Sequence, residues 1–273
     1  MNLIEIDGTG PIWRQRYEAV RTVADEPVEA RMWEYANGFR ESWHDHSQAQ
    51  MIYVTRGVLQ ITTPAGMWTL TSHHGLWLPP TMLHELYAIG DVEVRTAYID
   101  AGTSAELERW STSRMFQVSP LLDALHGVLA TRSADVDTQR ARLALPLFLL
   151  ELSRAQVVLT GALPLPHDRR LRSICEQMLT CPENNDTIER WGERVGASTR
   201  TLARLFREET GLSFGQWRQQ LRLVEAIARL ALGRSVSVIA TELGYQSSSA
   251  FISMFRKTLG ETPQRYLRRG DTV

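Results

Sequence analysis

Two histidines, His44 and His46, have the type and spacing that suit metal or ligand binding in this chain of 273 residues. If they lie on a β-strand, both side chains point to one face of the sheet, because residues two positions apart share a face. Two imidazoles on one face, with a third from another strand, can bind Zn²⁺, Ni²⁺, Fe²⁺ or Cu²⁺. The same imidazoles can also line a pocket for an organic effector, or have only a structural role. The sequence leaves these interpretations open.

The residues around this pair resemble the two sequence motifs of cupins. The first motif is matched by Gly38, His44, His46, Gln50 and Gly57, with Gln50 where many cupins have Glu. The second is matched by Pro79 and His84, although its internal glycine is replaced and Ala88 stands at its final Asn position. The resemblance implies a β-barrel in which three histidines and Gln50 form the effector or metal site. The cofactor it implies is a divalent transition metal, for which the neutral amide of Gln50 is a weak ligand.

A helix predicted over residues 199–210 has a composition that suits DNA recognition. Its apolar side chains Leu202, Leu205 and Phe206 share one face, which we expect to pack inward. The opposite face then presents Thr199, Arg200, Ala203, Arg204 and Arg207. Arginine can bind guanine in the major groove through two hydrogen bonds, and neighbouring side chains can bind phosphates. A solvated helix face would show the same residues, so this helix alone does not decide the question.

A second copy of the same arrangement follows about fifty residues later. In each copy a helix, a short turn containing Gly and a second helix follow one another, and the second helix ends at Gly211 or Gly260. This is the helix-turn-helix pattern. In the second copy the outward face presents Ser248, Ser249, Ile252, Ser253 and Arg256. A long connecting helix between the copies is indicated by the helical spacing of Trp217, Leu221, Val224 and Ala228.

Residues 171–267 resemble the DNA-binding domain of AraC/XylS-type transcription regulators. The resemblance is strongest over two stretches, which match the family equally well. They are SVSVIATELGYQSSSAFISMFRKTLGETPQRY at 235–266 and ASTRTLARLFREETGLSFGQWRQQLRL at 197–223. It implies that two recognition helices enter successive major-groove segments of a double-stranded DNA operator. The residues carried over to the two grooves are Arg200, Ala203 and Arg204 for the first, and Ser248, Ser249 and Ser253 for the second. Ala203 and Ser253 stand where larger polar side chains often read bases, so we expect the first helix to read more sequence.

The elements that must position these residues fall into two kinds. Short strands are predicted at residues 31–36, 50–55, 58–63, 67–71, 75–78, 84–89 and 92–99. Turn residues separate them, among them the pairs 56–57 and 90–91, and this pattern favours a small barrel or sandwich. After Gly102 the spacing becomes helical, with helices over residues 121–129 and 143–152. The second of these is apolar nearly all round, so it is buried in its own domain or against a second subunit.

These elements predict a two-domain α+β protein. A cupin-like effector-sensing barrel occupies residues 1–110, and a helical dimerisation segment occupies 111–159. A linker with two prolines follows at 160–168, and an all-α DNA-binding domain with two helix-turn-helix motifs fills 169–273.

Composition and charge agree with this division. Residues 1–166 carry 13 Arg and 19 acidic residues, whereas residues 167–273 carry 16 Arg and one Lys against 12 acidic residues. Only the C-terminal half is therefore expected to meet a polyanion. No apolar stretch approaches the ~18 residues of a membrane span, and no secretory leader is visible. Two cysteines suit a reducing compartment, so we expect a cytoplasmic protein with no membrane partner.

Three functions of different classes are consistent with the sequence. The favoured one is a homodimeric transcription regulator, not an enzyme, that responds to an unknown small molecule or a metal bound in the barrel. A metal-dependent cupin enzyme with an accessory DNA-binding domain is the second, which Gln50 weakens because a neutral amide replaces a carboxylate in the metal site. The third is a constitutive DNA-binding protein whose barrel only dimerises. No P-loop, dinucleotide fingerprint or nucleophile elbow is visible in the sequence.

Overall fold

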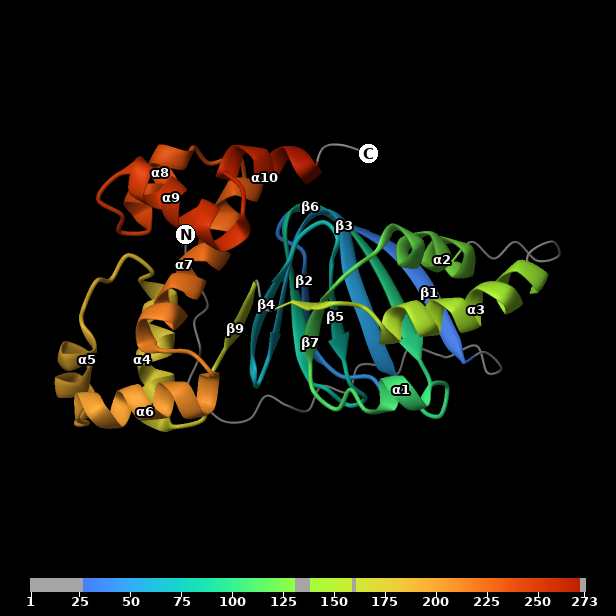
Figure 1. Cartoon of the computed structure of the whole chain (residues 1–273), viewed down its shortest axis with the longest axis horizontal. Helices are drawn as coiled ribbons and strands as arrows, with labels where there is room; N and C mark the ends of the chain where they lie inside the picture. Colours follow the sequence, from blue (N-terminus) through green and yellow to red (C-terminus); the bar gives the residue numbers. More distant parts are fainter. Residues whose placement is uncertain (1–26, 131–137, 159–160, 271–273) are drawn as a thin grey trace. The chain divides into compact units, whose positions relative to one another are not determined.

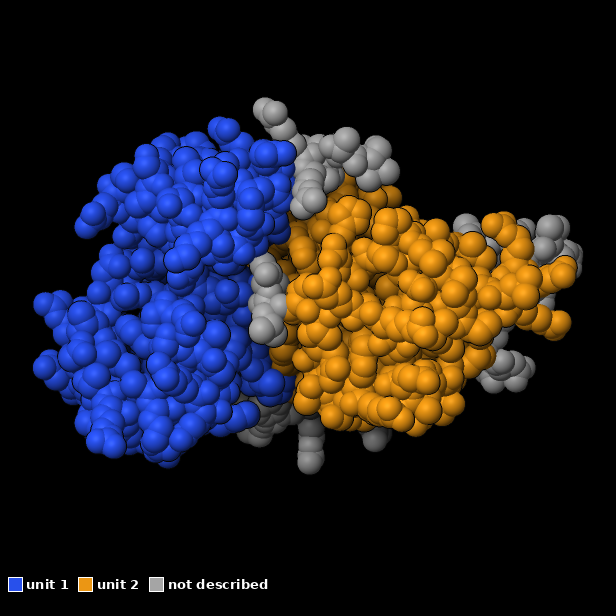
Figure 2. All heavy atoms as spheres, viewed as in Figure 1, with its two compact units in different colours: residues 1–15, 64–67, 161–268 blue, residues 16–63, 68–160, 269–273 orange. Residues whose placement is uncertain are grey.

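The computed structural model describes residues 27–130, 138–158 and 161–270, and the chain forms two compact units (Figure 2). Among these residues, one unit holds 27–63, 68–158 and 269–270, and the other holds 64–67 and 161–268. The parts of the predicted domains at residues 1–26 and 271–273 lie outside the described residues. The chain therefore has the two-domain organisation that was predicted, with a sheet-rich unit followed by a helical one.

The first unit is built on antiparallel strands (Figure 1). The strands are β1 (Val28–Tyr35), β2 (Arg40–His44), β3 (Ala49–Thr63), β4 (Gly66–Leu70), β5 (His74–Leu78), β6 (His84–Ile99), β7 (Arg114–Gln117) and β8 (Val157–Val158). They pair in the order β1-β6-β3-β5-β7-β8, with β2 on β6 and β4 on β3. The long strands β3 and β6 form the centre of the sheet, and every candidate ligand-binding residue lies on or beside them.

The prediction of turns at residues 56–57 and 90–91 was wrong. Residues 50–55 and 58–63 belong to one strand, β3, and residues 84–89 and 92–99 belong to one strand, β6. Gly57 and Gly90 have φ angles of 84° and 74°, and the register of β3 against β6 shifts around Arg56. A Cβ atom at Gly57 would lie 2.4 Å from the carbonyl oxygen of Asp91. Glycine therefore permits a bulge within two long paired strands rather than a chain reversal.

Two helices cover one face of this sheet. They are α2 (Pro120–Ala130) and α3 (Thr138–Ser153), and a short helix α1 (Ala105–Glu108) precedes β7. Leu122 of α2 and Phe148 of α3 are buried in one core with Met51 and Tyr53 of β3. The helices predicted at 121–129 and 143–152 are thus confirmed, and α3 begins five residues earlier than predicted.

The second unit contains both predicted helix-turn-helix motifs. After the short strand β9 (Ala162–Pro164) its helices are α4 (Arg169–Thr180), α5 (Ile188–Val195), α6 (Thr199–Thr210), α7 (Phe214–Ala231), α8 (Val236–Glu242), α9 (Ser248–Leu259) and α10 (Pro263–Gly270). The hydroxyls of Ser198 and Ser247 accept hydrogen bonds from the backbone at the starts of α6 and α9. These caps satisfy N–H groups that a helix start leaves without a partner, so each recognition helix begins at a defined residue.

Residues 161–168, where the linker was predicted, make contacts with the helical unit. Leu163 and Leu165 are buried in its core beside Trp191 and Trp217. The indole Nε1 of Trp217 donates a hydrogen bond of 2.7 Å to the carbonyl of Pro164.

Within the described ranges, no helix is both long enough and apolar enough to span a bilayer.

Candidate functional site

The three candidate histidines meet inside the sheet-rich unit. His44 of β2 lies directly opposite His84 of β6 in the antiparallel pairing, and their ring centroids are 4.2 Å apart. His46 follows β2, with its ring 4.9 Å from that of His44 and 5.4 Å from that of His84. Nitrogen atoms of all three rings lie within 4.8 Å of one another. We call His44, His46 and His84 the histidine cluster.

Hydrogen bonds fix which ring nitrogens of the histidine cluster carry a hydrogen, and burial affects the charge of its rings. The Nδ1 atoms of His44 and His84 lie 2.7 Å and 2.8 Å from the carbonyls of Ser42 and Met82, so each Nδ1 carries the hydrogen. Burial, with a smaller contribution from His44, lowers the pKa of His46 to about 4 and that of His84 to about 3. Both rings are therefore neutral at pH 7, which is the form that coordinates metals.

Gln50 of β3 completes the cluster from the neighbouring strand. Its amide Nε2 donates hydrogen bonds to Thr96 Oγ1 at 3.1 Å and to the Tyr98 hydroxyl at 3.4 Å. Within the described part of the chain, its Oε1 atom is buried without a hydrogen-bond partner, and so are the Nε2 atoms of His46 and His84. Buried acceptors without donors are costly. A divalent transition metal fits this donor set, because its positive charge would satisfy all of these atoms at once.

A chain of polar contacts connects the same strands to helix α2. Thr96, which binds Gln50, accepts a hydrogen bond on its carbonyl from Nε2 of buried His126 at 2.9 Å. The Tyr53 hydroxyl donates to Asp123 at 2.8 Å, and Arg95 forms an ion pair with the same carboxylate at 3.0 Å. Sequence reasoning missed these residues because each contact joins strand and helix positions far apart in the chain. They hold α2 against the strands that carry the cluster.

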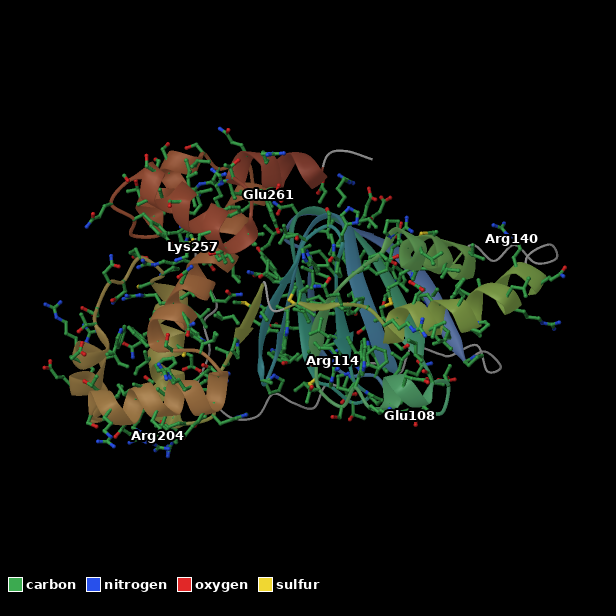
Figure 3. All side chains as sticks on the ribbon, in the orientation of Figure 1. Glu108, Arg114, Arg140, Arg204, Lys257 and Glu261 are labelled. Atoms are coloured by element: carbon green, nitrogen blue, oxygen red, sulfur yellow. The ribbon has the colours of Figure 1, made fainter. Side chains whose placement is uncertain are left out.

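The first recognition helix, α6, presents the face that the helical period predicts. Leu202 and Phe206 are fully buried. The exposed residues of the opposite face are Thr199, Arg200, Ala203, Arg204 and Arg207. Arg204 lies on the exposed face of α6 (Figure 3). Its guanidinium forms an ion pair with Glu208. This pair is exposed and weak, so the guanidinium is available to a stronger acceptor such as a base edge or a phosphate.

The second recognition helix, α9, borders an open hollow of about 560 Å³. Ser249, Ser253 and Arg256 are exposed, whereas Ser248 is half-buried. The residues that line the hollow are Ser249, Ile252, Ser253, Arg256, Lys257 and Thr262. Lys257 and Thr262 were not predicted; the spacing of four from Ser253 to Lys257 could have indicated the first of them. Two cations and three hydroxyls give this surface the composition of a phosphate-binding face.

Comparison with known proteins supports both units. A model described as "AraC-like ligand binding domain" matches residues 27–181, and a model described as "Helix-turn-helix domain" matches residues 191–269. The HTH-type transcriptional regulator NimR of Escherichia coli (strain K12) is 34% identical over 235 residues, which cover 84% of this chain and 83% of NimR. The HTH-type transcriptional regulator RipA of Corynebacterium glutamicum is 35% identical over 103 residues, or 38% of this chain and 31% of RipA.

Among solved structures, ToxT from Vibrio cholerae aligns with 89% of this chain and 98% of its own, at 13% identity and a TM-score of 0.38. The family assignment rests on the two models and on NimR. The chain is a DNA-binding transcription regulator with a ligand-binding domain. It belongs to the AraC-type family.

Proposed function

We propose that this regulator binds its operator through the exposed faces of α6 and α9 and that a ligand in the histidine cluster controls the response. Control by a ligand is supported by the buried acceptors on His46, His84 and Gln50, which lack donors among the described residues. Operator binding is supported by the exposed arginines of α6 and by the hydroxyls and cations beside α9. Arginines of α6 read bases, whereas the serines of α9 position the helix on phosphates.

The ligand that suits the cluster is a divalent transition metal such as Zn²⁺, Ni²⁺, Fe²⁺ or Cu²⁺. His44, His46 and His84 would hold the ion through imidazole nitrogen, with the amide oxygen of Gln50 as a neutral ligand. When bound, the ion supplies a positive charge to which a polar effector can bind. A metal-free pocket is the second candidate, in which an organic effector donates hydrogen bonds to the same atoms.

The regulator acts as a homodimer through α2 and α3. Leu143, Leu147 and Leu150 recur along one face of α3 and are 70%, 40% and 41% exposed. Leu121 of α2 is 45% exposed. A second copy of this helix pair would cover the leucines, since exposed apolar rows at helical spacing are typical of helix–helix interfaces.

The chain acts in the cytoplasm and has no enzyme activity. Both parts of this proposal are supported by the named relatives, which are transcription regulators.

Elemental analysis of protein purified without a histidine tag tests the metal. We expect about one transition-metal ion per chain in the wild type and none in the His44→Ala/His46→Ala/His84→Ala variant. If the wild type is metal-free and the triple variant loses its response to effector, the ligand of the cluster is an organic effector rather than a metal. If the wild type is metal-free and the triple variant still responds, the cluster is not the effector site.

A further inference from the structure

Glu41 lies on the same strand as His44, at a spacing that normally places two side chains on opposite faces. A bulge in β2 changes this. Glu41 pairs with Leu86, and His44 pairs with His84, so three steps along β2 match two steps along β6. Leu86 and His84 are two apart on β6 and share a face, and both are buried. Glu41 and His44 therefore share that face as well.

The carboxylate of Glu41 is close to the histidine cluster. Its Oε1 atom is 3.7 Å from Nε2 of His44. Because Nδ1 of His44 carries the hydrogen that faces Ser42, Nε2 is the ring nitrogen turned toward the Glu41 carboxylate. Two ligands on one tetrahedral Zn²⁺ ion, at about 2.0–2.2 Å each, lie about 3.3 Å apart. The observed separation is within a few tenths of an ångström of that value.

Glu41 differs from other carboxylates on the neighbouring strands in what it faces. Two other carboxylates, on β1 and β6, are held by cations. Glu29 pairs with Arg31, and Glu85 pairs with Arg40 at 2.7 Å. Glu41 instead faces an imidazole.

The geometry points to Glu41 as the anionic ligand of the metal site, together with His44, His46 and His84. This inference rests on the proposed metal site. Three neutral imidazoles leave a divalent ion with its full charge, and the amide of Gln50 does not reduce it. A carboxylate from β2 supplies the negative charge that Glu would supply at position 50 in many cupins. Gln50, held through its Nε2 by Thr96 and Tyr98, still presents its Oε1 atom to the ion as a neutral ligand.

Metal titration of the full chain, stripped with a chelator, tests the inference. Zn²⁺ affinity is measured by competition with a chromophoric chelator, and the visible absorption spectrum of bound Co²⁺ reports the ligand set. We expect Glu41→Gln to weaken Zn²⁺ binding at least 10- to 100-fold and to change the Co²⁺ spectrum. The matched control Glu34→Gln makes the same charge change at an exposed position of β1 and should leave both unchanged. Thermal unfolding of each chelator-stripped variant checks that the fold is retained.

A rescue variant separates a lost ligand from a lost charge elsewhere. Glu41→Gln/Gln50→Glu restores a carboxylate at the cluster and should recover most of the affinity. If Glu41→Gln binds Zn²⁺ with an affinity within twofold of the wild type, Glu41 is not a ligand. The proposed metal site is then unaffected. A wild type that binds neither Zn²⁺ nor Co²⁺ removes the metal site itself, and the inference with it.

Discussion

At the scale of single residues, buried histidines have their orientation fixed by hydrogen bonds to backbone carbonyls. His126 is the clearest case outside the histidine cluster. It is fully buried, it donates to the carbonyl of Thr96, and its ring packs against Tyr53 of β3 at 5.4 Å. Position 126 alone carries no sign of this role, because its partners come from distant strands.

His126 should make the stability of the chain depend on pH. Burial lowers its pKa to about 4, below the ordinary value of about 6.5. The unfolded chain binds more protons between these values, so the free energy of unfolding falls as the pH drops from 7 to 5, by about 2 kcal/mol from this group. Urea unfolding of chelator-stripped wild type and His126→Gln at both pH values measures it. Gln keeps a donor for Thr96 but does not titrate, so an identical pH dependence in both proteins would contradict the assignment.

Arg204 should contribute to base recognition. Arg204→Ala is expected to cost about 1–3 kcal/mol of operator binding and to relax preference at one base pair. Selection from a random DNA library followed by sequencing identifies the operator and measures the preference. Arg56→Ala, the loss of an exposed arginine in the other unit, is the matched control. Equal weakening on every sequence would make Arg204 a phosphate contact instead.

At the scale of elements, the sequence predicts helices better than strands. The helices of both motifs could be predicted to within a residue or two, because their caps and apolar spacing are local. The continuous strands β3 and β6 could not be predicted, because glycine at positions 57 and 90 is compatible with either a turn or a bulge. Pairing with the other strand decides between the two. The bulge of β2 could not be predicted either, because the pairing of β2 with β6 determines it. His46 lies beyond the end of β2, so strand alternation does not explain why its ring meets that of His44, and alternation also assigns Glu41 to the face opposite His44.

Helix α3 should carry the dimer interface. The exposed leucines are Leu143, Leu147 and Leu150, whereas Leu149 packs partly against the core and is a poor site for a test. Leu143→Glu/Leu147→Glu should yield folded monomers, because two buried charges without partners would be too costly in an interface. Analytical ultracentrifugation at micromolar concentration measures the change. An unchanged sedimentation coefficient would exclude this face of α3.

At the scale of the whole molecule, DNA binding has to work despite a net charge of −1. The positive charges that matter are local, on α6 and beside α9. Affinity should therefore fall steeply with salt, and Lys257→Ala should weaken binding on all sequences and reduce the log–log salt slope by about 1. Anisotropy titrations at several salt concentrations measure this slope. A slope near zero for the wild type would contradict phosphate binding by these residues.

Occupancy of the histidine cluster should change the affinity of the protein for its operator. The operator affinity of the full chain is measured by fluorescence anisotropy at one salt concentration with and without saturating Zn²⁺. We predict a change of about 5-fold or more for the wild type, and none for His44→Ala/His46→Ala/His84→Ala, which should still bind the operator. Identical affinity of the wild type with and without bound Zn²⁺ would contradict the account.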